Sequence, residues 1–106
     1  MYKMTVTIQS CGGDKTKYRL GISIKDSLKF KNRKVIVRFM IDDFIFETKT
    51  TCGQWYINDE GEIVFKKGFD LYSKEISDYI INNGLNDYEK GKPNKVDIFI
   101  FSGFYD

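Results

Sequence analysis

The chain has 106 residues, a formal net charge of +2 and no histidine. This length fits a single domain, residues 1–106, with a core of its own, and the lack of histidine removes the commonest general base and metal ligand. Alanine, the best helix former, is absent, whereas there are 9 Phe and 7 Tyr, so the composition favours β-sheet over helix.

Two segments near the start alternate apolar and polar residues, Lys3–Gln9 and Lys17–Ile24. Each is predicted to be a half-buried strand. The side chains expected to face inward are Met4, Val6, Ile8, Tyr18, Leu20, Ile22 and Ile24. Gly21, in the middle of the second strand, indicates a bulge or a close approach of another backbone.

The segment Lys25–Phe30 is long enough only for one helical turn, which Asp26 or Ser27 could cap. Residues 29–34 read Lys-Phe-Lys-Asn-Arg-Lys, which is typical of an exposed basic loop.

A hairpin is predicted next. Val35–Ile41 is almost continuously apolar, which indicates a central strand covered on both faces over much of its length. Asp42-Asp43 then forms a two-residue turn, and Phe44–Thr50 returns as a strand, with a break expected at Thr51–Gly53.

A second hairpin is predicted from Gln54–Asn58 and Glu62–Lys67, joined by Asp59-Glu60-Gly61 with glycine available for a left-handed conformation. Phe69–Tyr72 should be extended, and Lys95–Phe101 should form the last strand.

One segment has the pattern of a helix with both ends marked. Ser73 is a favoured N-cap for Lys74–Asn83. Gly84 fits the position just past the helix, and Leu85 could then contact Ile80 in a Schellman-type ending.

These elements add up to about seven strands and one short helix near residues 73–84. The fold class is therefore mainly β, a β-rich α+β domain. A partly closed barrel or pseudobarrel is the most economical way to bury many aromatic residues without long sheet edges.

The two cysteines are Cys11 and Cys52. Because no apolar leader or membrane-length segment is present, we expect a cytoplasmic protein without membrane contact and with two reduced thiols, a single disulfide being the alternative. Two cysteines without histidine cannot form a standard zinc site unless subunits share it. We therefore expect no metal and no cofactor.

Two parts of the chain share a plan of strand, lysine beside an acid, helical turn, basic loop and Val-containing strand. The first begins at Tyr18 and the second at Phe69, and the second has twelve more residues between its strands. They are either two related units about a pseudo-twofold axis or a chance similarity of strand pairs.

Over residues 17–41 and 69–100 this plan resembles the AbrB-like swapped-hairpin unit and the B3-type DNA-binding pseudobarrel. Those families usually have Ile-Pro-Lys before the turn, whereas Ile24-Lys25 lacks the proline and Ser73 takes its place in the second copy. The resemblance implies binding of double-stranded DNA through basic loops, at the matching positions Lys25, Arg33, Lys34 and Lys74.

The charges themselves also favour a polyanion partner. Residues 1–38 have ten Lys or Arg and two acids, a net of +8, whereas residues 39–106 have seven and thirteen, a net of −6. A basic face of this kind suits nucleic acid. With the lysine that the resemblance adds, the candidate nucleic-acid-binding residues are Lys17, Arg19, Lys25, Lys29, Lys31, Arg33, Lys34 and Lys74.

Each side-chain type has an expected task. Arg33 is suited to bidentate contact with a phosphate or a guanine edge, and the lysines to backbone contacts. Tyr18, Phe30, Trp55 and Tyr56 could stack on bases if exposed, although core packing is the commoner role of such residues.

Two alternatives are open. Asp42, Asp43 and Glu47-Thr48-Lys49 could form the carboxylate and Glu-x-Lys set of a metal-dependent nuclease, although ordinary hairpin chemistry explains the same residues. The chain could also be a phage-type or mobile-element inhibitor or adaptor, with anchors at Trp55, Tyr56, Phe104 and Tyr105.

We expect a non-enzymatic domain that binds nucleic acid, with duplex DNA favoured, or a nucleic-acid-associated protein. A homodimer is compatible with the sequence.

Overall fold

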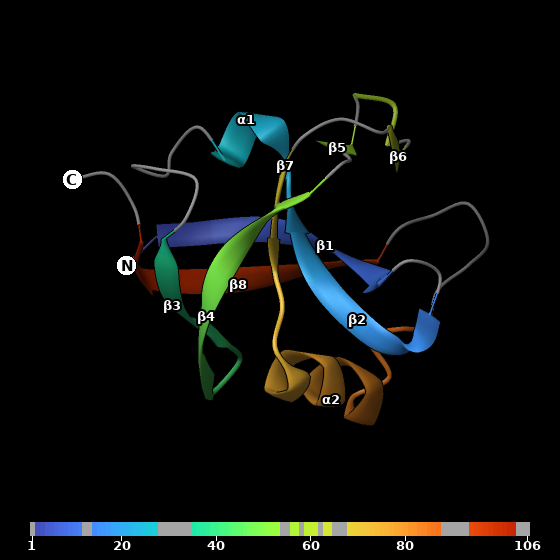
Figure 1. Ribbon diagram of the computed structural model, residues 1–106, viewed down its shortest axis with the longest axis vertical. Helices are drawn as coiled ribbons and strands as arrows, with labels where there is room; N and C mark the ends of the chain where they lie inside the picture. The colour runs from blue at the N-terminus through green and yellow to red at the C-terminus, as the bar shows by residue number, and fades with distance from the viewer. Residues whose placement is uncertain are drawn as a thin grey trace.

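Six strands form a closed antiparallel barrel in the ring order β1-β2-β7-β4-β3-β8 (Figure 1). The computed structural model describes residues 2–11, 14–27, 35–53, 56–57, 59–61, 63–64, 68–87 and 94–103. The barrel strands are β1 (Tyr2–Cys11), β2 (Asp14–Ile22), β3 (Ile36–Ile41), β4 (Phe44–Gly53), β7 (Gly68–Leu71) and β8 (Asn94–Ser102). The remaining elements are β5 (Tyr56–Ile57), β6 (Ile63–Val64), α1 (Ile24–Ser27) and α2 (Lys74–Asn82). The predicted mainly β barrel is thus confirmed, and its ring is closed.

Alternation along each strand separates the core from the surface, because successive side chains of a strand point to opposite faces. The buried core consists of Met4, Val6, Ile8, Tyr18, Leu20, Ile22, Val37, Phe39, Ile41, Phe69, Leu71, Ile76, Tyr79, Ile80, Ile98 and Ile100. The inward residues predicted for the first two strands are confirmed, with one exception. Ile24 belongs to α1 and not to the strand.

The connectivity of the barrel is twofold symmetric. Exchanging β1 with β4, β2 with β7 and β3 with β8 leaves every neighbour relation of the ring unchanged. Each half therefore has two strands, a helix and a third strand, and β5 and β6 are an addition to the second half. This is the arrangement expected if the two similar parts of the sequence are related units.

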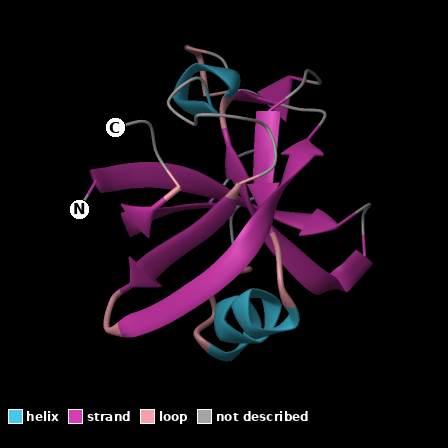
Figure 2. Cartoon of the chain, turned by 60° about the vertical axis from the view of Figure 1, so that its left-hand side comes forward, coloured by secondary structure: helices cyan, strands magenta, loops and turns pink. Residues whose placement is uncertain are grey.

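The helices lie at opposite ends of the barrel, α1 at one end and α2 at the other, in both views (Figures 1 and 2). The ends of α2 are those predicted. The Ser73 side chain accepts a hydrogen bond from the Ile76 N–H at 3.1 Å. Gly84 has φ +67°, and the Leu85 N–H donates to the Ile80 carbonyl at 2.9 Å, which is the Schellman pattern.

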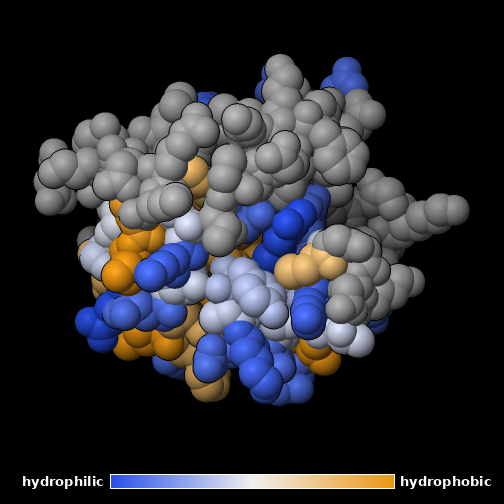
Figure 3. All heavy atoms as spheres, in the orientation of Figure 1, coloured by the Kyte–Doolittle hydropathy of each residue, from blue (hydrophilic) through white to orange (hydrophobic). Residues whose placement is uncertain are grey.

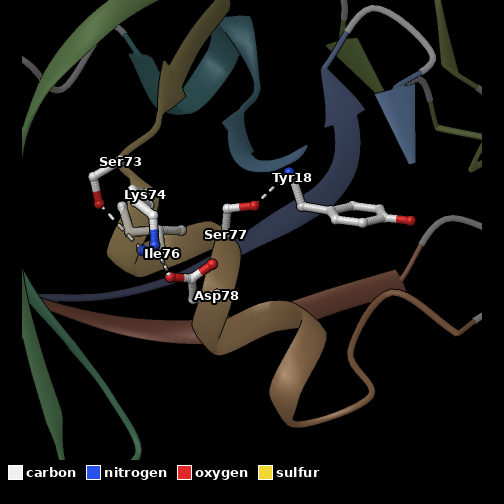
Figure 4. Close-up of polar contacts among 6 residues, drawn as sticks. All are labelled: Tyr18, Ser73, Lys74, Ile76, Ser77 and Asp78. Carbon is white, nitrogen blue, oxygen red and sulfur yellow. Dashed lines mark hydrogen bonds and ion pairs between the residues drawn. The ribbon is translucent and has the colours of Figure 1, made fainter. Parts of the chain in front are cut away.

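Hydroxyl groups complete the barrel where β7 stops. β7 pairs with β2 only as far as Leu20, so the next edge positions of β2 lack a strand partner there. Ser77 is buried, with 4% of its surface exposed. Its Oγ accepts a hydrogen bond from the backbone N–H of Tyr18 at 3.0 Å (Figure 4). On the other side of β7, the Thr48 hydroxyl donates to the Tyr72 carbonyl at 2.6 Å. Both contacts satisfy backbone groups at a ladder end.

Tyr79 connects α2 to the β3–β4 hairpin. Its hydroxyl donates to the Asp42 carboxylate at 2.8 Å, and its ring lies 5.2 Å from that of Phe44 and 5.4 Å from that of Phe46 between centroids. Asp42 has φ +51°, a left-handed conformation that Asp tolerates better than most residues. The turn predicted at Asp42-Asp43 is confirmed.

Three local expectations are wrong. β3 is covered on one face only, since Ile36 is 55% exposed. The expected break at Thr51–Gly53 is part of β4, because these residues pair with β7. The cap of α1 is Ser23, whose Oγ accepts from the Asp26 N–H at 3.2 Å, and not Asp26 or Ser27.

The second predicted hairpin is present as a two-stranded sheet of β5 and β6 outside the barrel ring. Gly61 in its turn has φ +80°, the left-handed conformation expected there. No helix in the described part of the chain is long and apolar enough to cross a membrane.

Candidate nucleic-acid interface

Strand register places three cationic residues on one outward face, formed by β1, β2 and β8. Because Ile8 pairs with Leu20 and both are buried, the neighbouring pair Gln9 and Arg19 faces outward. Lys17 is exposed two residues before Arg19. Lys95 pairs with Thr7, two residues before Gln9, and is also exposed.

We call Lys17, Arg19 and Lys95, with Gln9 between them, the basic face. Arg19 lies on β2 and Lys95 on β8, the two strands that flank β1. Their pairing partners on β1, Gln9 and Thr7, are two residues apart. Standard sheet spacings put the Cα atoms of Arg19 and Lys95 on the order of 12 Å apart. The three cations are therefore close enough to act on one polyanion.

Arg19 is anchored by a buried carboxylate. Its Nη1 lies 3.1 Å from the Asp70 Oδ2, and the Asp70 side chain is only 5% exposed. Gly21 pairs with Asp70 and lies between it and Arg19 on the outward face, and its missing side chain leaves room for the guanidinium to pass. The register continues through Gly21 on both sides, so the glycine does not mark a bulge.

The rest of the Arg19 guanidinium is only weakly bound. Nη2 donates to the Gln9 Oε1 at 3.5 Å, and the buried Nε has no hydrogen-bond partner in the described part of the chain. Asp70 thus orients Arg19 and offsets most of its charge. The unbalanced positive charge of this face comes from Lys17 and Lys95.

Farther along the same side, Lys3 is neutralised. Its Nζ lies 3.4 Å from the Asp97 Oδ2, and the Thr5 hydroxyl donates to the other carboxylate oxygen at 2.6 Å. The hydrogen bond from Thr5, followed by the contact with Lys3, lowers the pKa of Asp97. Asp97 is therefore a stable anion, and it marks the edge of the basic face.

The other predicted residues do not all join this face. Lys25 is exposed on α1, whereas Lys74 begins α2 at the opposite end of the barrel (Figure 2). The Lys74 Nζ lies 2.8 Å from the Asp78 carboxylate (Figure 4), and the hydrogen bond to Asp78 raises the pKa of Lys74. Lys25 and Lys74, which the resemblance matched to its two copies, thus lie at opposite ends of the barrel.

Several predicted residues cannot be placed. The loop cations Lys29, Lys31, Arg33 and Lys34 lie outside the described residues, as do Phe30, Trp55, Phe104, Tyr105 and the side chain of Tyr56. Tyr18 is 5% exposed and belongs to the core, so it is not available to stack on a base. Lys95 was missed because only the pairing of β8 with β1 brings it beside the basic segment.

The carboxylates of the nuclease alternative do not assemble. Asp42 accepts from Tyr79 at the α2 end, whereas Glu47 pairs with Arg38 on the outer face of the sheet. Among the described residues, no group of three or more His, Cys, Asp or Glu side chains could hold a metal ion. The side chain of Cys52 lies outside the described part, so the expectation of two reduced thiols stays a prediction.

No protein-family model matches the chain, and neither a curated protein nor a solved structure is significantly similar to it. The basic face is therefore interpreted from its own chemistry. It offers two exposed ammonium groups and one oriented guanidinium, which together suit a row of phosphates better than a single small anion.

Proposed function

We propose that the chain is a non-enzymatic nucleic-acid-binding domain that contacts the phosphate backbone of duplex DNA with the basic face. The observation that carries the proposal is the register of β1 with β2 and β8, which puts Arg19 and Lys95 on one outward surface, with Lys17 exposed two residues before Arg19. Phosphate contacts of this kind position a protein on nucleic acid without reading the sequence.

The form of the side chains supports a phosphate partner. Lys17 and Lys95 are exposed ammonium groups on flexible stems, which can follow a backbone. Arg19 is held by Asp70, and its side chain is 26% exposed. Its orientation is therefore fixed before binding, and little side-chain entropy is lost when a phosphate arrives.

The absence of stacking groups favours a duplex over a single strand. Single-strand binders combine positive charge with aromatic rings on which bases stack. The outward residues of β1 and β2 that the structure describes between Lys3 and Gly21 include no exposed aromatic ring, and the outward rings of β8, Phe99 and Phe101, lie beyond Asp97, the edge of the basic face. A surface with charge and polar groups alone matches the outside of a double helix.

The test measures fluorescence anisotropy of labelled duplex DNA, single-stranded DNA and RNA against protein concentration, at several salt concentrations. The slope of log K against log salt is about −0.9 for each phosphate contact on B-DNA. Lys17→Ala combined with Lys95→Ala should flatten this slope by about two units, with similar weakening on different sequences. Arg33→Ala with Lys34→Ala should do the same if the predicted basic loop extends the face.

Lys49→Ala is the matched control for a lost lysine, because Lys49 is exposed on β4, the strand opposite β1 in the ring. Its slope should equal that of the wild type. Failure of the wild-type protein to bind any of the three nucleic acids at low salt would overturn the proposal. Equal losses for Lys49→Ala and the double variant would overturn the assignment to the basic face.

A further inference from the structure

A second surface, which adjoins the basic face along β8, is apolar where a solvated sheet face should be polar. Its outward residues are Ile36 and Met40 on β3, Ile45 on β4, and Phe99 and Phe101 on β8. We call these five residues the apolar face. Ile36 and Ile45 are each 55% exposed and Phe101 is 44% exposed.

These residues are contiguous because the strands that carry them are neighbours. Met40 pairs with Ile45 on one side and with Phe99 on the other. A register shift beside Arg38 leaves Phe101 as an extra residue on β8. Figure 3 shows apolar side chains gathered at the left of the molecule, over β3 and β4, with hydrophilic ones beside them. A contiguous exposed apolar patch usually marks an interaction site.

Two charges of opposite sign lie within this surface. Arg38 and Glu47 pair across β3 and β4, next to the pair of Met40 and Ile45, and both are exposed. The Arg38 guanidinium lies 6.0 Å from the centre of the Phe101 ring. A third charge, the exposed Lys49, pairs with Ile36 at the end of the same two strands, so this surface carries two cations and one anion.

We infer that the apolar face binds a second copy of the chain in a twofold dimer. When two equal faces meet, the twofold axis lies in the plane between them. If this axis runs parallel to β3 and β4, midway between them, each β3 residue of one copy lies opposite the β4 residue of the partner that occupies the paired position. Arg38 then faces the partner's Glu47, and Met40 faces the partner's Ile45. β3 and β4 thus supply both halves of an apolar and charge-complementary centre, with Ile36 facing the partner's Lys49 and with Phe99 and Phe101 at the rim of the contact.

Other occupants fit less well. A peptide that adds a strand needs a free sheet edge, and β3, at the centre of the apolar face, is paired on both of its edges, with β4 and with β8. A strongly basic partner would meet Arg38 and Lys49, and a strongly acidic partner would meet Glu47 between these two cations. Since the contact involves the convex side of a barrel and few residues, the dimer should be weak and reversible.

The test is sedimentation velocity of the full chain without nucleic acid, over about 1 μM to 1 mM, a range that covers weak interfaces. The wild type should shift from monomer to dimer with concentration. Arg38→Glu and Glu47→Arg should each weaken the dimer at least about tenfold, because two like-charge contacts replace two attractive ones. An equimolar mixture of the two variants should form heterodimers again, since each cation then faces an anion.

The mixture separates contact between copies from a pair within one chain, because an intramolecular role of Arg38 and Glu47 cannot be restored by mixing. Asp87→Arg, an exposed reversal outside this face, should leave the dimer unchanged, and Ile45→Ser should weaken it without any charge change. A wild type that stays monomeric at the highest concentration would overturn the inference, as would a mixture that stays monomeric. Either result leaves the proposed DNA binding untouched, because no nucleic acid is present.

Discussion

Tyr79 shows how one side chain can join two elements by both of its ends. Tyr79 is 9% exposed, and its ring packs against Phe44 and Phe46. Its hydroxyl donates a hydrogen bond to the Asp42 carboxylate. Burial, followed by the hydrogen bond to Asp42, raises the pKa of Tyr79 to about 12. The phenol therefore stays protonated in the folded protein at pH values where it ionises in the unfolded chain.

This pKa predicts a stability loss at high pH. The folded state binds the Tyr79 proton more tightly than the unfolded state, whose pKa is about 10. The stabilisation is fully present below pH 10 and is lost as the pH rises toward 12. Tyr79→Phe keeps the ring but lacks the proton, so its free energy of unfolding should fall less between pH 10 and 12. Urea unfolding of both proteins across this range measures the difference, and parallel pH profiles would contradict the assignment.

At the scale of elements, local signals were sufficient for α2 and insufficient for its surroundings. Ser73 and Gly84 act through backbone groups a few residues away, so sequence alone located both ends of the helix. The contact of Ser77 with Tyr18 joins residues 59 positions apart, and no pattern in the helix itself indicates it. The one-sided exposure of β3 was missed for the same reason, because an apolar outward residue looks like a core residue until its neighbours are known.

Two substitutions in α2 test these contributions separately. Gly84→Ala should lower the free energy of unfolding by about 1 kcal/mol, because φ is +67° there, a conformation that alanine disfavours. No steric clash adds to this cost, since nothing lies within 4 Å of the added Cβ. Ser77→Ala should cost about 1–3 kcal/mol, because the buried Tyr18 N–H loses its acceptor. Ser77→Thr, which keeps the hydroxyl, is the matched comparison. Thermal midpoints unchanged in both Ala variants would mean that α2 contributes little to the fold.

At the scale of the whole molecule, sequence patterns were enough for the fold class and insufficient for the surfaces. Alternation and turn signals gave a β-rich barrel, because both act within single strands. The ring order depends on pairings such as β2 with β7, which no local pattern contains. The basic face shows the same limit. Lys17 and Arg19 were found from charge, but the balance of Arg19 by Asp70 and the approach of Lys95 follow only from register.

Closure of the ring predicts a graded pattern of backbone protection. The amides of β1 pair with β2 and β8 along most of the strand, so they should exchange with solvent only on global unfolding. β5 and β6 form only two residue pairs in a sheet of their own, and such small sheets are marginally stable. Hydrogen exchange followed by NMR should therefore show β5 and β6 exchanging far faster than Met4–Ile8. Equal protection would show that β5 and β6 are stabilised by contacts not seen among the described residues.

The pairing of β1 with β8 also has a consequence for synthesis of the protein. The hydrogen bonds between Tyr2–Ile8 and β8 can form only after Asn94–Ile100 has been synthesised. Until β8 leaves the ribosome, β1 and β3 both present an open edge, and such edges are templates for pairing with other nascent chains. Contacts between such distant parts of the sequence also slow folding. Translation of the last strand is therefore the step after which both edges can be closed against pairing with other nascent chains.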